Sequence, residues 1–194
     1  EVLYDAYKLF RKARTERGAI DFETTETRII FDANRKIEDI VPVERNDAHK
    51  IVEECMLCAN VATARFLKKH KIPSLYRVHD GPSPERLASV RAFLGELGLD
   101  LPGGDKPHSS DYQTLLASIK DRSDVNVIQT VMLRSLSQAV YSPEERGHFG
   151  LGFPSYAHFT SPIRRYPDLV VHRGIKSVIH GDNPTDTVIK PDQL

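Results

Sequence analysis

The stretch that most constrains this chain lies near its C-terminal end, where residues 147–168 read GHFGLGFPSYAHFTSPIRRYPD. Glycine tolerates backbone conformations and close approaches that other residues do not, so the first half predicts an extended segment with sharp turns. The serine and proline at 161–162 are typical of a helix start, whereas Pro167 would interrupt a continuous helix. The stretch therefore predicts one short turn over 162–166 and a longer helix over 167–179.

Arginines gather around this stretch. Between residues 146 and 173, one acid, Asp168, is accompanied by four arginines: Arg146, Arg164, Arg165 and Arg173. The two adjacent arginines would stand at the helix start, where unpaired N–H groups and the helix dipole favour an anion such as phosphate. A guanidinium fork also matches phosphate geometry. The chemistry alone leaves a second interpretation open, a solvated or ion-paired turn.

Composition sets broader limits. Charge is balanced, with 27 Lys and Arg against 27 Asp and Glu, which argues mildly against a protein that coats nucleic acid. Binding to a phosphate backbone needs a basic track rather than a basic average, so the local surplus of arginine matters more. No apolar run approaches the ~20 residues that a membrane span needs, and we expect no membrane partner. No signal peptide is visible, and the chain does not begin with methionine, so we expect a processing or cloning boundary there.

The cysteines and histidines carry no strong metal signal. Cys55 and Cys58 spell C-x-x-C inside a predicted helix in apolar company. Without a second pair, the spacing favours two buried small hydrophobes over a zinc or redox site. Two cysteines without an extracellular signal fit a reducing cytosol, so we expect a cytoplasmic location. The eight histidines show no zinc-protease spacing, and we expect them to make structural hydrogen bonds instead.

Hydrophobic periodicity predicts an α+β chain that is rich in helices. Helices are expected over 1–15, from 46 or 47 to about 70, and over 84–97, 111–120 and 125–140; strands are expected over 28–31, 37–43 and 72–79. Residues 32–36 would form the hairpin turn between the first two strands. The apolar face of the second helix is predicted from Ile51, Val52, Cys55, Cys58, Ala59, Ala62 and Phe66.

The run from His158 to Asp168, with residues 147–150 before it and 172–173 after it, resembles the signature of a known family. This is the ribonuclease II/ribonuclease R (RNB-type) family of processive exoribonucleases, and the resemblance is greatest to its bacterial ribonuclease R branch. Further matching segments are 17–24, 45–50, 53–56 and 76–79. The resemblance weakens after Gly181. It implies that residues 1–181 form the C-terminal part of an RNB-type catalytic domain and that 182–194 form a polar tail or loop.

The resemblance also implies roles for individual residues. Arg164 matches the arginine of the family that contacts the scissile phosphate, and we expect it to be catalytic. Phe22 matches a phenylalanine that stacks on the 3′-terminal bases, and an exposed ring is a base platform that tolerates any sequence. Glu54 matches a glutamate that hydrogen-bonds a ribose 2′-hydroxyl, the group that separates RNA from DNA. From composition alone, a core position for Phe22 and a surface charge for Glu54 remain open.

Other residues of the signature have weaker expectations. Arg165 and Arg173 are further candidates for RNA binding, with an internal ion pair as the alternative for each. His158, Tyr166 and Asp168 are expected to hold the turn in shape.

The resemblance implies a metal that this chain would not hold by itself. In the family, aspartates bind magnesium, and the activated water attacks the terminal phosphodiester of single-stranded RNA, which releases 5′-nucleotides in the 3′→5′ direction. The candidate carboxylates of this chain lie in separate segments and form no such cluster: Asp21, Glu23, Glu53, Glu54 and Asp168. We therefore expect the aspartates upstream of Glu1, and the missing part of the domain and the RNA-binding domains of a parent protein as partners.

The sequence thus predicts a part of a magnesium-dependent exoribonuclease that is inactive in isolation. Two alternatives come from other functional classes. One is a module that binds single-stranded RNA without cutting it. The other is a scaffold that has kept the fold and lost the chemistry.

Overall fold

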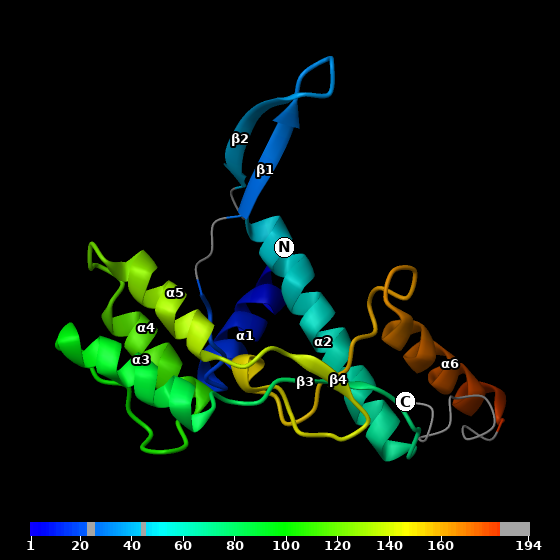
Figure 1. Cartoon of the computed structure of the whole chain (residues 1–194). Helices are drawn as coiled ribbons and strands as arrows, with labels where there is room; N and C mark the ends of the chain where they lie inside the picture. Colours follow the sequence, from blue (N-terminus) through cyan, green and yellow to red (C-terminus); the bar gives the residue numbers. More distant parts are fainter. Residues whose placement is uncertain (23–25, 44–45, 183–194) are drawn as a thin grey trace.

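The long helix α2 runs through the middle of the molecule, and the other elements are arranged around it (Figure 1). The computed structural model describes residues 1–22, 26–43 and 46–182. Its elements are α1 (Val2–Glu16), β1 (Glu26–Phe31), β2 (Ile37–Val43), α2 (Asp47–Lys69), β3 (Tyr76–Val78), α3 (Pro84–Glu96), α4 (Ser109–Ser118), α5 (Val125–Ser135), β4 (Val140–Ser142), the 3-10 turn η1 (Phe149–Leu151) and α6 (Tyr166–His180). The fold is mixed and helix-rich, as predicted. The predicted tail over 182–194 lies outside the described residues except for Asp182.

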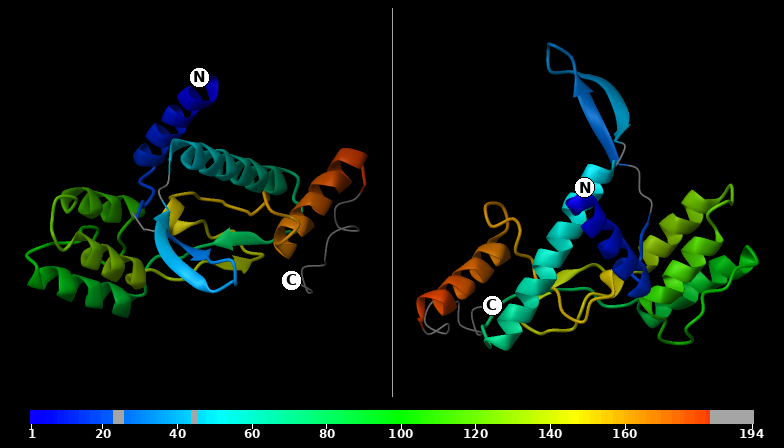
Figure 2. Two further views of the ribbon diagram at one scale, coloured as in Figure 1. Left: turned by 90° about the horizontal axis from the view of Figure 1, so that it is seen from above. Right: turned by 180° about the vertical axis from the view of Figure 1, so that it is seen from behind.

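Helices α3, α4 and α5 gather on one side of the molecule and α6 lies on the other (Figures 1 and 2). Between them, β3 and β4 form a short antiparallel ladder in which Tyr76 pairs with Ser142 and Val78 with Val140. The predicted hairpin of β1 and β2 is confirmed, with Ile29 opposite Ile40, and it stands away from the body (Figure 1).

The buried apolar residues form two main clusters. The first joins α3, α4 and α5, and its fully buried members include Leu94, Tyr112, Ile119, Ile128 and Met132. The second joins α2, β3, the glycine-rich segment and α6, through Ala64, Leu67, Val78, Ala157 and Val171. The signature stretch is thus part of a core that it shares with α2.

Helix α2 begins as predicted but turns a different face inward. Asn46 caps it by accepting a hydrogen bond from the backbone N–H of His49 at 3.1 Å. The predicted apolar face is wrong: the buried residues are Glu54, Leu57, Asn60, Val61, Thr63, Ala64 and Leu67. Both cysteines are exposed, so their predicted burial is also wrong. The reason is that the buried polar residues find partners in other segments, which a count of apolar spacing does not register.

Two other boundaries differ from the prediction for a similar reason. The fifth helix ends at Ser135 rather than near 140, because Leu136 turns to an extended conformation and the next residues are drawn toward β3. There the backbone C=O of Ser137 lies 2.8 Å from His79 Nε2, and the hydroxyl of Ser137 donates to the C=O of Gly81 at 2.8 Å. The strand expected over 72–79 is reduced to β3, which pairs with the unpredicted β4.

Across the described ranges, no helix combines the length and apolar character that crossing a membrane would require.

Gly18, which follows the C-cap residue of α1, offers a test of this packing. Its φ is +75°, and an added Cβ would lie 2.7 Å from Cβ of Ser110. We expect Gly18→Ala to destabilise the fold by about 1–3 kcal/mol, because the left-handed conformation and the contact both penalise a side chain. Gly95 in α3 has open space around the same position, so Gly95→Ala should stabilise by about 0.5–1 kcal/mol. Urea unfolding followed by circular dichroism measures both; equal effects would contradict the packing described.

Candidate functional site

The glycine-rich segment, which is the first half of the 147–168 stretch, folds back on itself beside the end of α1. The backbone N–H of His148 donates to the C=O of Phe153 at 2.8 Å, and the N–H of Phe149 donates to the C=O of His79 at 2.7 Å. Gly152 has φ +64°, and an added Cβ would lie 2.9 Å from the backbone oxygen of Arg17. Glycine is therefore required here both for the conformation and for the close approach, as the sequence predicts.

A buried carboxylate closes the turn that follows. Asp168, which is 0% exposed, accepts hydrogen bonds at Oδ1 from the backbone N–H of Ser161 at 2.8 Å and from Arg165 Nη2 at 2.7 Å. The C=O of Ser161 accepts from the backbone N–H groups of Arg164 and Arg165 at 3.3 and 3.0 Å. The predicted turn is present, and α6 begins at Tyr166, one residue before the prediction. Arg165 occupies the N-cap position of α6, so the expected capping role of Ser161 is not seen at this helix.

This turn separates the two adjacent arginines. Arg165 is used internally, in the ion pair with Asp168. Arg164 is exposed and makes no side-chain hydrogen bond or ion pair with any part of the chain that the structure describes. Its neighbour Ile163 is fully exposed, at 102%. The turn therefore exposes the unpaired guanidinium of Arg164, while the ion pair of Arg165 holds the backbone of the turn in place.

The remaining signature residues differ in their contacts. His158 Nδ1 lies 2.8 Å from the hydroxyl of Tyr141, so it is held on the β4 side of the turn. Tyr166 is 55% exposed, and its ring makes no contact with another ring in the described ranges, which gives its expected structural role no support. Arg173 is exposed on α6, without an ion pair to the described residues.

Helix α2 ties this turn to the rest of the site through Asn60. Its amide Nδ2 donates to the hydroxyl of Tyr156 at 2.8 Å, and its Oδ1 accepts from the backbone N–H of Phe159 at 2.9 Å. Asn60 itself is 3% exposed. The backbone just before the arginine turn is therefore fixed to the same helix that carries Glu54.

Glu54 is not a surface charge, so that interpretation is wrong. The residue is 5% exposed, and its Oε1 accepts a hydrogen bond from Arg14 Nη1 at 2.9 Å. Phe22 is partly buried and packs against the apolar cluster of α3, α4 and α5. This half-buried position fits both interpretations of Phe22, a core residue and a ring that stacks on bases.

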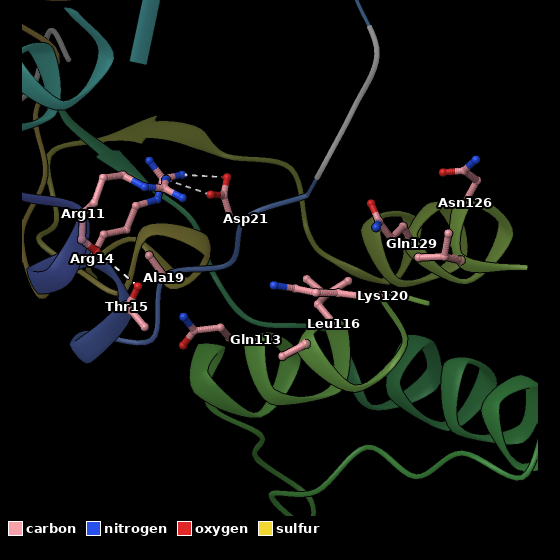
Figure 3. A pocket seen from close by; sticks show the side chains of 12 residues that line it. Arg11, Arg14, Thr15, Ala19, Asp21, Gln113, Leu116, Lys120, Asn126 and Gln129 are labelled. Carbon is pink, nitrogen blue, oxygen red and sulfur yellow. Dashed lines mark hydrogen bonds and ion pairs between the residues drawn. The ribbon is translucent and has the colours of Figure 1, made fainter. Parts of the chain in front are cut away.

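Sequence reasoning missed Arg14 and weighed Asp21 only as a possible metal ligand. Arg14 Nη1 also donates to Oε1 of Glu53 at 3.1 Å, and Arg14 Nη2 donates to Oδ1 of Asp21 at 3.2 Å. Asp21 accepts a second hydrogen bond, from Arg11 Nη1 at 2.9 Å (Figure 3). A signal was available: Arg11 and Arg14 are three residues apart, the spacing at which side chains are neighbours on a helix surface.

The electrostatics of Arg14 follow from this arrangement. Burial alone would lower the pKa of Arg14, but the attraction of Asp21 and the hydrogen bonds to Glu54 and Glu53 outweigh it and raise the pKa. The guanidinium therefore stays charged while it is enclosed by three carboxylates.

A cleft of about 400 Å³ lies beside this cluster, between α1 and helices α4 and α5 (Figure 3). Besides Arg11, Arg14 and Asp21, its lining includes Gln113, Lys120 and Gln129. It offers amide and ammonium donors next to the Arg14 cluster.

No group of three or more His, Cys, Asp or Glu side chains within residues 1–22, 26–43 and 46–182 is arranged to hold a metal ion.

Comparison with known proteins identifies extensive similarity. The family model of the RNB domain matches residues 1–181. Ribonuclease R of Escherichia coli strain K12 is 55% identical over 192 residues, which cover 96% of this chain and 24% of that protein. The solved structure of Mycoplasma genitalium RNase R in complex with ribose methylated single-stranded RNA is similar with a TM-score of 0.83 and 35% identity, covering 88% of this chain and 27% of the other.

A more distant structure shares the fold alone. Yeast Ssd1, described as a pseudonuclease, has a TM-score of 0.69 at 21% identity over 94% of this chain and 23% of its own. The chain thus spans about a quarter of the length of the proteins it matches.

The histidines of the site predict a pH dependence of stability. Burial lowers the pKa of His148 to about 3 and that of His158 to about 4. In the unfolded chain both histidines would titrate at about 6.5, so the unfolded chain binds more protons. The neutral histidines contribute their full stability above the pKa of the unfolded state. This stability is lost as the pH falls toward the pKa values of the folded state, by up to ~1.4 kcal/mol per histidine for each pH unit.

We therefore expect the free energy of unfolding, measured in urea, to fall between pH 7 and pH 5, where most carboxylates remain ionised. His148 Nδ1 accepts a hydrogen bond from the backbone N–H of Leu151 at 3.3 Å. His148→Asn keeps an acceptor without a titrating ring, so the decline should become less steep. A stability that does not change over this range would contradict the neutral, enclosed state of these rings.

Proposed function

Because this chain belongs to the RNB domain family, we propose that it is part of a 3′→5′ exoribonuclease and supplies residues that contact the RNA and the scissile phosphate. The observation that carries the proposal is the family match over residues 1–181, which includes the turn that presents Arg164. The domain assignment of the sequence analysis, a C-terminal part of the catalytic domain over 1–181, belongs to the same proposal.

Single-stranded RNA is the proposed ligand. The similar protein of Mycoplasma genitalium was solved in complex with ribose methylated single-stranded RNA, and this supports RNA as the partner of the present chain. The exposed, unpaired Arg164 and Arg173 are cations that a phosphate backbone could reach.

Arg164 is the residue proposed to meet the scissile phosphate. Charge that develops on phosphoryl oxygens is best stabilised by a cation that is already in place, since no reorganisation is then needed during the reaction. The hydrogen bonds of Asp168 to Ser161 and Arg165 hold the base of the turn. Arg165, in its ion pair with Asp168, is better suited to positioning Arg164 than to contacting RNA.

Glu54 and Phe22 are proposed as contacts to the ribose and to the bases near the 3′ end. Support comes from their common neighbour: Arg14 binds Glu54 directly and also binds Asp21, which precedes Phe22 in the chain. The two contacts would then lie on one wall of the RNA path.

The residues of this chain do not fit a magnesium site, since its described carboxylates form no cluster of the required kind. We place the magnesium-binding aspartates in a part of a longer protein outside this chain, together with further RNA-binding domains. A cytoplasmic location is part of the same proposal.

A binding module or scaffold without catalysis is the second candidate. The observation that favours it is the likeness to yeast Ssd1, because a pseudonuclease with this fold shows that fold and activity are separable. Salt dependence distinguishes an RNA-binding module from a scaffold: affinity for single-stranded RNA should fall steeply with salt only if phosphates are contacted.

The role of Arg164 can be tested in the full-length protein that carries this segment. We expect Arg164→Ala to reduce single-turnover RNA cleavage by about 10²–10³-fold and RNA affinity much less, because other phosphate contacts remain. Arg164→Lys should restore little, since an ammonium lacks the guanidinium fork. Arg134→Ala, at an exposed arginine on α5, is the matched control and should cleave normally. Near-normal turnover of Arg164→Ala would exclude the assignment.

The chain by itself provides a second test. Phosphodiester hydrolysis of the proposed kind needs a metal to generate the nucleophile, so we expect the purified 194-residue chain with magnesium or manganese to degrade no RNA above background. The measurement is a denaturing gel of end-labelled single-stranded RNA. Metal-dependent release of mononucleotides would show that a complete site is present and that the proposed division of the domain is wrong.

A further inference from the structure

Arg14 is the most enclosed cationic residue of the described ranges, at 7% exposure, although it lies on a helix whose other polar residues are largely exposed. It joins three segments: α1, which carries it; α2, through Glu53 and Glu54; and the segment after α1, through Asp21. Charged residues are rarely buried without a specific partner. Here one planar group makes hydrogen bonds to three carboxylates.

Burial of such an ion cluster is weak evidence for stability. The cost of removing charges from water offsets much of their attraction, and apolar residues of similar size often serve the fold as well. What the cluster does provide is orientation, because a guanidinium donates in a fixed plane and constrains each carboxylate that it binds. The arrangement therefore points to a need for defined carboxylate positions.

The two oxygens of Glu54 are used differently. Oε1 accepts from Arg14 Nη1 at 2.9 Å and lies 3.9 Å from Arg11 Nη1. Oε2 has no hydrogen-bond partner among the described residues, yet it is not one of the fully enclosed polar atoms that lack a partner. Oε2 is thus not fully enclosed and is left free to accept from a donor outside the chain, while the hydrogen bond at Oε1 holds the carboxylate in place.

The same guanidinium fixes the neighbouring segment. Asp21 binds Arg14 through Oδ1 and Arg11 through Oδ2, so its carboxylate is held from both sides. The backbone just before it is anchored as well, since the N–H of Ile20 donates to the C=O of Gly150 at 2.8 Å. Phe22 follows directly and packs on the α3–α5 cluster.

We propose that Arg14 is a positioning residue that holds Glu54 Oε2 toward the 2′-hydroxyl of bound RNA and aligns the Asp21–Phe22 segment beside it. Sugar selectivity then depends on Arg14 although Arg14 does not contact the RNA. This inference rests on the proposed function, since it requires that Glu54 reads a ribose. The competing explanation is that Arg14 only stabilises the fold.

The test uses the full-length protein and two oligonucleotides of identical sequence. One is all-ribose, and the other has a single 2′-deoxyribose near the 3′ end. The deoxyribose is placed where the wild-type protein discriminates most strongly between the two sugars. The readout is the ratio of kcat/KM on the two. Glu54→Ala should lower this ratio by about tenfold or more, as loss of a hydrogen bond to a charged acceptor does. Arg14→Met should lower it by a similar factor.

Two features distinguish positioning from simple stabilisation. The double variant Arg14→Met with Glu54→Ala should lower the ratio no further than Glu54→Ala alone, because both changes remove the same contact. Arg14→Lys should recover the melting temperature but leave the ratio at least about threefold low, because an ammonium cannot span both segments. Lys12→Met is the control on the same helix, since Lys12 is exposed and pairs only with exposed Glu16 among the described residues.

The possible outcomes distinguish failure of the positioning role of Arg14 from failure of the proposed exoribonuclease function. If Glu54→Ala lowers the ratio while Arg14→Lys and any folded Arg14→Met do not, Arg14 is only structural and the inference is overturned. If the ratio is unchanged in Glu54→Ala although the wild type degrades RNA, Glu54 does not read the sugar and the inference falls with it. A wild-type protein that degrades no RNA would instead overturn the proposed function.

Discussion

Polar side chains buried on α2 require partners, and this requirement organises the site. Glu54 and Asn60 are both nearly enclosed, and each hydrogen-bonds a segment distant in sequence, Glu54 through Oε1. Leaving such groups without hydrogen bonds would be costly, since a buried unsatisfied polar group is penalised by its full desolvation. The partners therefore determine which face of α2 is buried, and that choice brings α1 to one end of the helix and the signature stretch to the other.

The same principle shapes the arginine turn. Asp168 is fully buried, and it is stabilised by one backbone donor and one guanidinium. Arg165 donates to Oδ1 of this carboxylate, whereas Arg164 has no side-chain partner among the described residues and is exposed. Two adjacent arginines thus acquire different tasks, one as part of the framework and one available to a ligand. A composition argument that counts basic residues cannot make this distinction.

The relation to known proteins concerns fold more directly than activity. The RNB domain match and the ribonuclease R relatives establish the family, but the chain spans only about a quarter of those proteins. The fold also occurs in a pseudonuclease, so the presence of these elements alone does not establish catalysis. In the proposed division, RNA contacts lie in this chain and the metal ligands lie elsewhere in a longer protein.

The sequence by itself determined most local features of the protein, because these depend on neighbouring residues. Asn46 and Ser83 cap their helices as their side chains allow, the hairpin turns at 32–36, and Pro167 restarts a helix after the arginine turn. The signature also identified the family.

Only the tertiary structure decided what each side chain does. It placed Glu54 inside and the two cysteines outside, paired Arg165 with Asp168, and revealed Arg14 as the link between α1, α2 and Asp21. The physical reason is that burial of a polar group depends on partners that come from other segments, as with Asn60 and Phe159, which lie 99 positions apart in the chain. Local periodicity contains no information about such partners.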